Sequence, residues 1–364
     1  MRPKVLVAPL DWGLGHATRC IPIIKELIEL NCEVVIAADY HIYFLLKNEF
    51  PSTVFLRLRG YEMEYSRNKN WLYLKLLRQA PGLLWNIQME HKWLDKVIEQ
   101  YNIDAVVSDN RFGMHSKKVP CIYITHQLLI KTGNSFIEKI AQKIHAYFIK
   151  KYKICWVPDR KQNGLAGALS HPKKVDSIVK YIGPLSRFRK IENMEKKFDL
   201  LVSISGPEPQ RSIWEKAILS ELKNYEGTVL ILRGLPNDAH EINLPNSRIK
   251  MVNHLPAAEL NLALEQSEIV ISRSGYTTIM DLVKLKKNAI LVPTPGQTEQ
   301  EYLAKFLMKK GFFYSTTQEN FSLKKSLEHY HLFKTVETNI PTDVYKTVIN
   351  EFVVSLKTGN FAAQ

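Results

Sequence analysis

The sequence is poor in the features that mark metal-binding, secreted or membrane-spanning proteins. It has only four cysteines among 364 residues, at positions 20, 32, 121 and 155. They are far apart and form no C-x-x-C pair, so neither a zinc site nor a disulfide framework is predicted, and a reducing compartment fits best. No stretch approaches the about 18 uninterrupted apolar residues that a transmembrane helix needs. The apolar start at 4–10 is short and Asp11 follows it, which predicts a first strand and not a signal peptide.

Acidic residues are in deficit. The chain has 50 lysines and arginines against 36 aspartates and glutamates, which gives a formal charge of +14. This charge is compatible with nucleic acid, with anionic lipid or with a merely solubilising surface. With 45% hydrophobic and 24% charged residues the composition is that of a globular protein, and the length suits two domains.

Strand and helix patterns alternate along the first half, which predicts an α/β fold with a doubly wound parallel sheet. We expect strands at 4–9, 33–37, 53–58, 104–108, 121–125 and 154–158. Gly13, Gly15 and His16 follow the first strand and lead into a helix. Ligands of open α/β sheets bind at this edge, beyond the carboxyl ends of the strands. A dinucleotide fingerprint would need glycine at 18, where the sequence has Thr18.

Two further polar clusters follow predicted strands of the same half. Asp109 comes directly after the strand at 104–108, and His126 directly after the strand at 121–125. We therefore expect His16, Asp109 and His126 at one edge of the sheet. A carboxylate near a histidine orients the ring or raises its pKa for proton transfer. This pattern makes His16 the first candidate for a general base and Asp109 the second.

A boundary is predicted where Gly183-Pro184 and a charge-rich stretch interrupt the alternation. A second set of strands and helices starts at residue 198, which predicts another doubly wound sheet. The expected organisation is an N-terminal domain at 1–183, a linker at 184–197, a C-terminal domain at 198–342, and a final helical segment at 343–364 that packs back on the first domain.

The most informative stretch lies between residues 268 and 302. A β-branched run at 268–272 predicts a buried strand, which Ser274-Gly275 interrupts before a helix begins. Free N–H groups and the dipole at a helix N-terminus favour a phosphate, and the hydroxyls of Ser274 and Thr277 can add donors. Asp281 lies little more than one turn into this helix, where its carboxylate could accept from a ribose diol. The stretch predicts a nucleotide-sugar site.

Residues 61–94 and 130–153 mix apolar and aromatic side chains with lysines and arginines. Amphipathic helices of this kind can bury an apolar face and place cations against anionic headgroups. Core helices with solvated lysines have the same pattern, so a structural role is a second interpretation. Stacking of the aromatic side chains on nucleic-acid bases is a third. No RNA-binding signature accompanies the segments, so no nucleic-acid partner is expected.

The order of these motifs resembles that of the GT-B glycosyltransferases, in which two Rossmann-like domains face a central cleft. A glycine loop with a histidine opens the first half, and S-x-S-G with a later aspartate and a P…Q-x-x-Q-x-Y loop marks the second. The likeness is strongest to the MurG-type group, UDP-N-acetylglucosamine transferases with a family 28-type C-terminal domain and a lipid-linked acceptor. It is specific at residues 11–19 and 272–302. It implies acceptor binding by the N-terminal half and nucleotide-sugar binding by the C-terminal half.

The resemblance implies roles for individual residues. The acceptor side is matched by Gly13, Gly15, His16 and His126. Asp281 stands where the family has a glutamate that holds the ribose, and Gln300 and Glu301 match paired glutamines that contact the donor sugar. The full set of donor candidates is Ser205, Gly206, Arg211, Leu255, Ser274, Gly275, Tyr276, Thr277, Asp281, Gln297, Gln300 and Glu301.

The sequence departs from the family in the first donor loop. The family's Gly-Gly-Ser is replaced by residues 205–211, which contain one glycine and two prolines. Arg211 could neutralise a phosphate there instead. The family's glutamate and second glutamine are replaced by Asp281 and Glu301. With these changes the sequence does not define which sugar and which base the donor carries.

The expected reaction is transfer of N-acetylglucosamine or a related hexose from a UDP-sugar to a hydroxyl of a lipid-linked or cell-surface glycan acceptor, with inversion as the resemblance implies. No D-x-D pair stands at a strand end, so the helix dipole and cations are expected to stabilise the leaving diphosphate without a metal or other cofactor. The alternatives are a nucleotide-sugar hydrolase of a sialic-acid-like pathway, a related epimerase, and a non-catalytic binder of membrane or nucleic acid. We expect a bacterial cytoplasmic enzyme of cell-envelope polysaccharide synthesis, with attachment to the inner face of the plasma membrane left open.

Overall fold

The computed structural model of the protein describes residues 2–11, 13–60, 69–131, 134–235, 247–333 and 340–359, without the side chains of residue 41 and residues 69–80. The predicted segment at 61–68 lies outside these residues. The chain divides into two compact units, Met1–Leu185 with Pro341–Gln364 (unit 1) and Ser186–Ile340 (unit 2). The helices of the described part include none that is long and apolar enough to cross a membrane.

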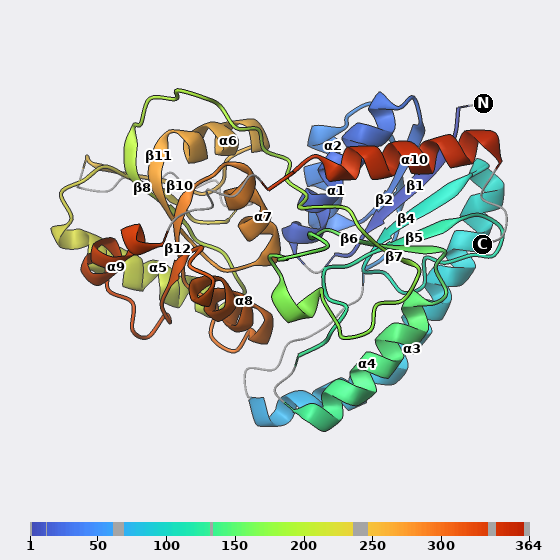
Figure 1. The fold of residues 1–364 in the computed structure, drawn as a ribbon, viewed down its shortest axis with the longest axis horizontal. Helices are drawn as coiled ribbons and strands as arrows, with labels where there is room; N and C mark the ends of the chain where they lie inside the picture. Colours follow the sequence, from blue (N-terminus) through green and yellow to red (C-terminus); the bar gives the residue numbers. More distant parts are fainter. Residues whose placement is uncertain are drawn as a thin grey trace. The chain divides into compact units, whose positions relative to one another are not determined.

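Unit 1 is built on a parallel sheet with the strand order β3-β2-β1-β4-β5-β6-β7 (Figure 1). The strands are β1 (Lys4–Pro9), β2 (Glu33–Ala38), β3 (Val54–Arg57), β4 (Ala105–Asp109), β5 (Cys121–Ile124), β6 (Ile154–Val157) and β7 (Val179–Tyr181). The central strands are buried on both faces, as expected for a parallel sheet covered by helices. The strand order reverses between β1 and β4, which places the switch point of unit 1 there.

Helices cover both faces of this sheet. On one face, α3 (Lys69–Tyr101) and the end of α4 (Ser135–Ile149) share a core with side chains of β1 and β5. On the other face, α1 (Leu14–Glu29) contacts β1, β2, α2 (Tyr40–Glu49) and α10 (Val344–Thr358). Phe352 of α10 meets Trp156 of β6 edge to face, with ring centroids 5.5 Å apart. The C-terminal helix therefore completes the core of unit 1.

Unit 2 is built on a second parallel sheet, with the order β10-β9-β8-β11-β12-β13. Its strands are β8 (Phe198–Ser203), β9 (Val229–Leu232), β10 (Ile249–Val252), β11 (Ser267–Ser272), β12 (Asn288–Leu291) and β13 (Tyr314–Ser315). Its α-helices are α5 (Gln210–Glu221), α6 (Ala257–Glu265), α7 (Tyr276–Lys284), α8 (Thr298–Lys309) and α9 (Leu323–His329). The strand order reverses between β8 and β11, so this sheet also has a central switch point.

The predicted fold class is confirmed by these two doubly wound parallel sheets. The sequence pattern does not predict the edge strands β7 and β13, because two or three residues are too short for a readable period. The expected linker at 184–197 lies mostly within unit 2, where Lys190 pairs with Glu265 at 2.9 Å.

Candidate active site

The polar residues at the switch point of unit 1 come from the ends of two neighbouring strands. Pro9 of β1 pairs with Asp109 of β4 at the last position of their register. Gly13 follows with a φ of 86°, a left-handed value that favours glycine, and α1 begins at Leu14. His16 therefore lies in the first turn of α1, beside the end of β4 that carries Asp109.

The side chain that joins these residues is Arg19, which sequence reasoning did not single out. Arg19 lies on α1 and is 2% exposed. Its Nε donates to Oδ2 of Asp109 at 2.6 Å, and its Nη2 donates to Oδ1 of the same carboxylate. Nη2 also lies 2.6 Å from Nδ1 of His16, and Nη1 lies 3.3 Å from Nδ1 of His126. One guanidinium connects the buried carboxylate to both predicted acceptor-site histidines.

Burial and neighbouring charges set the protonation of this cluster. The pKa of His16 is lowered, first by burial and then by the charge of Arg19, so the imidazole is neutral at pH 7. Burial by itself would raise the pKa of Asp109, but Arg19 and His16 outweigh it and hold that pKa at about 2. Asp109 is therefore an ionised carboxylate whose two oxygens are both bonded to Arg19.

This geometry does not fit the predicted general-base roles. Asp109 is fully buried and very weakly basic, so we correct its role to that of an anchor for Arg19. A guanidinium can only donate, so Nδ1 of His16 accepts in their contact and the imidazole proton resides on Nε2. In this state His16 offers a donor and not a base to a ligand.

A second buried arginine, Arg111, contacts the end of β1 and the start of the glycine loop. Arg111 is fully buried; its Nη1 bonds to Glu90 and its Nε donates to the carbonyl of Pro9 at 2.9 Å. Its Nη2 lies 3.5 Å from Oδ1 of Asp11, the residue that begins the glycine loop. Arg111 thus ties the end of β1 to α3.

In unit 2, the two predicted donor turns flank the switch point. Gly206 follows β8 with a φ of 114°, and Ser274 and Gly275 join β11 to α7. Within the described part of the chain, the backbone N–H groups of Gly206, Ser274 and Gly275 have no hydrogen-bond acceptor. Unpaired N–H groups at a helix N-terminus form a site for an anion such as a diphosphate.

Arg273 is buried between these turns. It too was not among the residues predicted from the sequence. Its guanidinium contacts the carbonyl oxygens of Ser205, Gln210, Val292 and Pro293 at 3.2–3.4 Å, and Oε1 of Gln318 at 2.7 Å. No carboxylate among the described residues pairs with it, and it lies 5.1 Å from the ring centroid of Trp214. Burial lowers the pKa of Arg273 to about 10, so it remains a cation at neutral pH.

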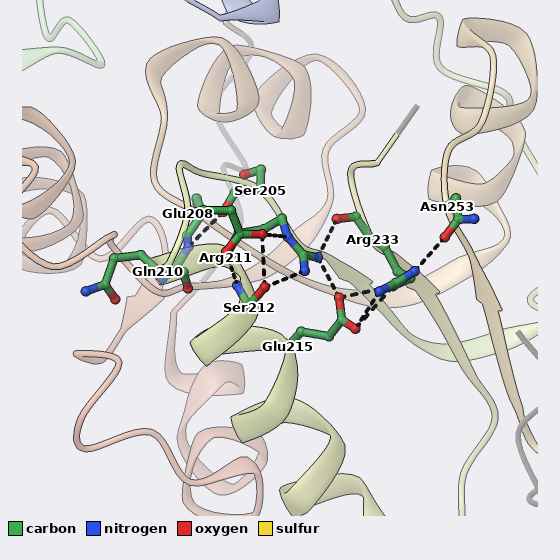
Figure 2. A network of polar contacts seen from close by, with 9 residues as sticks. Ser205, Glu208, Gln210, Arg211, Ser212, Glu215, Arg233 and Asn253 are labelled. Atoms are coloured by element: carbon green, nitrogen blue, oxygen red, sulfur yellow. Dashed lines mark hydrogen bonds and ion pairs between the residues drawn. The ribbon is translucent and has the colours of Figure 1, made fainter. Parts of the chain in front are cut away.

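Arg211, predicted to neutralise a phosphate, is held by carboxylates instead (Figure 2). Its Nε lies 2.7 Å from Glu208 and its Nη1 2.5 Å from Glu215, which also pairs with Arg233 at 3.1 Å. The Arg211 side chain is 7% exposed. We correct its role: the charge of Arg211 is already balanced, and it fixes the start of α5.

Asp281, predicted to bind the ribose, lies on α7 and is half-buried. Ser186 donates a hydrogen bond of 2.5 Å to its Oδ1. Burial raises the pKa of Asp281 to about 7, against the opposing effects of the Ser186 bond and the Arg187 charge. Ser186 comes from the expected linker, and its contact with Asp281 could not be read from the sequence because 95 residues separate them.

The sugar-side candidates are tied into the loop between β12 and α8. Oε1 of Gln300 accepts from the N–H of Thr294 at 2.9 Å, and Gln300 donates to Gln297 at 2.5 Å. Glu301 accepts from the N–H of Gly296 at 2.9 Å. These bonds shape the loop, and the buried hydroxyl of Thr294, which sequence reasoning missed, has no partner within the described residues.

The remaining candidates lie on the same edge of their sheets. Leu255 follows β10 and is half-buried, and Thr277 lies in the first turn of α7. Tyr276 is 3% exposed and packs in the core of unit 2, so its side chain is structural. Within the described ranges, no group of three or more histidine, cysteine, aspartate or glutamate residues could hold a metal ion.

Comparison with known proteins relates the chain to glycosyltransferases. Residues 213–341 match the glycosyltransferase family 28 C-terminal domain. An uncharacterized glycosyltransferase of Methanosarcina acetivorans is 21% identical over 87% of both chains. A UDP-N-acetylglucosamine–N-acetylmuramyl-(pentapeptide) pyrophosphoryl-undecaprenol N-acetylglucosamine transferase of Exiguobacterium sibiricum is 24% identical over 59% of this chain and 61% of its own. The crystal structure of Acinetobacter baumannii MurG superposes with a TM-score of 0.58 at 12% identity, covering 98% and 100% of the two chains.

The two parallel-sheet units, with polar sites at both switch points, define an α/β protein of the GT-B fold. The chain is a glycosyltransferase of the GT-B type whose unit 2 carries a family 28 C-terminal domain.

Proposed function

We propose that the protein transfers a hexose, most simply N-acetylglucosamine, from a UDP-sugar to a hydroxyl of a lipid-linked or cell-surface glycan acceptor, without a metal ion and with inversion. Unit 2 binds the donor and unit 1 the acceptor. The observation that carries the proposal is the set of unpaired N–H groups of Gly206, Ser274 and Gly275 beside a buried cationic Arg273. Such a site stabilises the charge that develops on a departing diphosphate.

The choice of donor draws on two supports. The Exiguobacterium relative is named as a UDP-N-acetylglucosamine-dependent transferase. Asp281 lies on α7 little more than one turn beyond Ser274-Gly275, and we infer that its carboxylate accepts from the ribose hydroxyls. The Ser186 bond keeps its side chain in one orientation in the absence of the donor.

A hydrolase that uses the same donor site with water as the acceptor is the second candidate. The polar cluster of His16, Arg19, Asp109 and His126 on unit 1 favours a transferase, because a water molecule does not require a built binding site.

Calorimetric titration of UDP-N-acetylglucosamine into the purified protein tests the donor site. Asp281→Ala is expected to weaken binding at least about tenfold, the effect of about one or two lost hydrogen bonds, with Asp176→Ala in unit 1 as the exposed control. His16→Ala is expected to leave donor binding unchanged and to abolish transfer to a lipid extract. Rapid turnover in water alone would identify the hydrolase, and failure to bind any nucleotide sugar would contradict the proposal.

We also propose that unit 1 docks on an anionic membrane through α4. The side chains of Phe136, Ile140, Ile144 and Tyr147 are 46–70% exposed and recur at helical spacing, so they form one apolar stripe. Lys139 and Lys143 are exposed on the same helix, Lys150 is exposed directly after it, and Nζ of Lys151 lies 4.6 Å from the ring centroid of Tyr147. An apolar stripe bordered by lysines matches a bilayer surface with anionic headgroups.

The adjoining helix extends this surface. Figure 1 shows α3 beside α4, and Leu83 and Ile87 of α3 pack with Phe148 of α4. Leu84, Trp85 and Met89 of α3 are 43–61% exposed. Phe148 lies in the same predicted segment, but it is buried in the core and does not belong to this surface.

Co-sedimentation with vesicles tests the docking surface. The pair Phe136→Ser and Ile144→Ser is expected to reduce partition into phosphatidylserine-containing vesicles at least about tenfold, because two buried apolar side chains contribute about 1.5–3 kcal/mol each. Phe44→Ser, a 66% exposed residue on α2, is the matched control. Equal partition of the double variant and the unaltered protein would contradict the docking proposal.

A further inference from the structure

Arg19, at the centre of the unit 1 site, makes more contacts than its ion pair with Asp109 requires. Two of its nitrogens, Nε and Nη2, are sufficient for the bidentate bond with Asp109. Two further contacts of Arg19 are directed at the same type of atom, Nδ1 of His16 and Nδ1 of His126. The bidentate bond to Asp109 fixes the orientation of the guanidinium, and the guanidinium in this orientation contacts both imidazoles.

These contacts restrict the tautomer of each ring. An arginine carries protons on all three nitrogens and has no lone pair to offer, so an imidazole nitrogen in contact with it has to accept. If Nδ1 of His16 carried the proton, two N–H groups would point at each other over 2.6 Å. The lowered pKa of His16 makes the doubly protonated ring unfavourable as well. His16 is therefore neutral with its proton on Nε2. For His126 the contact geometry alone requires Nδ1 to accept, since Nη1 of Arg19 lies 3.3 Å from it.

Without Arg19 the opposite tautomer of His16 would be favoured. Oδ2 of Asp109 lies 3.4 Å from Nδ1 of His16, and a carboxylate there can only accept. Nδ1 would then carry the proton, and the lone pair on Nε2 would face outward, as in a general base oriented by an aspartate. Asp109 and His16 could therefore form an aspartate–histidine pair, but Arg19 contacts both side chains and prevents Nδ1 of His16 from donating to Asp109.

We propose that Arg19 is a positioning residue that locks His16 and His126 as Nε2–H donors. Nε2 of His16 has no partner within the part of the chain that the structure describes, and its side chain is 16% exposed. That nitrogen therefore donates a hydrogen bond to an oxygen of the acceptor and does not remove a proton. This inference rests on the proposed transferase function for the identity of the ligand, but the tautomer itself does not depend on it.

The test is nitrogen-15 NMR of the histidine side chains in the full chain at pH 7.5, without donor or acceptor. The 11 histidines are labelled, and the signals of His16 and His126 are assigned by His16→Gln and His126→Gln. In the unaltered protein His16 is expected as the neutral Nε2–H tautomer, and His126 with its proton on Nε2 and not on Nδ1. An Nδ1–H tautomer or a protonated ring for His16 would overturn the proposal, whatever the enzyme is found to transfer.

Variants then link the tautomer to catalysis. Arg19→Met is expected to convert His16 to the Nδ1–H tautomer and to lower kcat about 100-fold, because the acceptor loses the Nε2–H donor, with the donor KM unchanged. Arg19→Lys keeps the charge but lacks the fork, and it is expected to behave like Arg19→Met. Arg57→Met, at an exposed arginine that pairs with Asp39, is the control and should change neither readout. A kcat that stays normal after the tautomer has switched would refute the positioning role.

Discussion

Arg111→Met is expected to lower the free energy of unfolding by about 3–5 kcal/mol, because it leaves a buried carboxylate without its cation. Glu90 is 5% exposed and bonds to Nη1 of Arg111. Its Oε2 accepts from the N–H of Gly113 at 3.2 Å, and a neutral donor does not compensate the lost cation. The variant also removes the donors to the carbonyls of Pro9 and Arg59, which lie at 2.9 and 3.1 Å. Urea denaturation followed by circular dichroism measures the loss.

The control for this prediction is a double variant. Arg111→Met combined with Glu90→Leu removes both charges and retains much of the volume, so it should recover most of the stability lost by Arg111→Met alone. Such recovery would assign the loss to the uncompensated charge. If the double variant is as unstable as the single one, the loss comes instead from the carbonyl groups and the packing around Arg111.

Arg273→Met is expected to weaken the binding of UDP by at least about 30-fold, which is about 2 kcal/mol and typical of a lost charge-assisted contact. Arg273 contacts the carbonyl of Ser205. Because a trans peptide unit is planar, this contact turns the N–H of Gly206 to the opposite side, where it can donate to a phosphate. The cation also adds a favourable charge to a buried site that has no carboxylate partner within the described residues.

Uridine serves as the matched ligand for this second prediction. It lacks the diphosphate, so its affinity should change less than about threefold in Arg273→Met. Arg248→Met, at an exposed arginine next to β10, is the control variant. An equal loss for UDP and uridine would show that the variant disrupts the whole site, and no loss for either would show that Arg273 does not act on the diphosphate. Calorimetric titration of both ligands separates these results.

Much of the candidate site could be predicted because it depends on local pattern. Gly13, His16 and Asp109 were predicted at strand ends, and parallel strands bring their carboxyl ends to one edge of a sheet. The turn at Ser274-Gly275 was predicted from a β-branched run followed by a helical period, and the structure has β11, the turn and α7 in that order. The roles of these residues in binding remain predictions.

The state of the charged side chains could not be predicted in the same way. Arg19, Arg111 and Arg273 are hardly distinguishable from solvated surface arginines in a chain of charge +14, yet they are 0–2% exposed. Arg211 seemed available for a phosphate until the structure showed Glu208 and Glu215 around it. A lysine or arginine side chain is buried only where hydrogen-bond acceptors from other segments surround it. Its burial therefore depends on its neighbours in space and not on its position in the sequence.

The sequence by itself determined the two doubly wound sheets, since periodicity and turn residues are properties of neighbouring positions along the chain. It also placed the glycine loop and the phosphate-type turn at the correct strand ends. Only the tertiary structure decided that Asp109 anchors an arginine and that the same arginine contacts Nδ1 of His16. Those contacts join α1 to β4 across 90 residues of sequence, and they are the basis of the proposed donor role of His16.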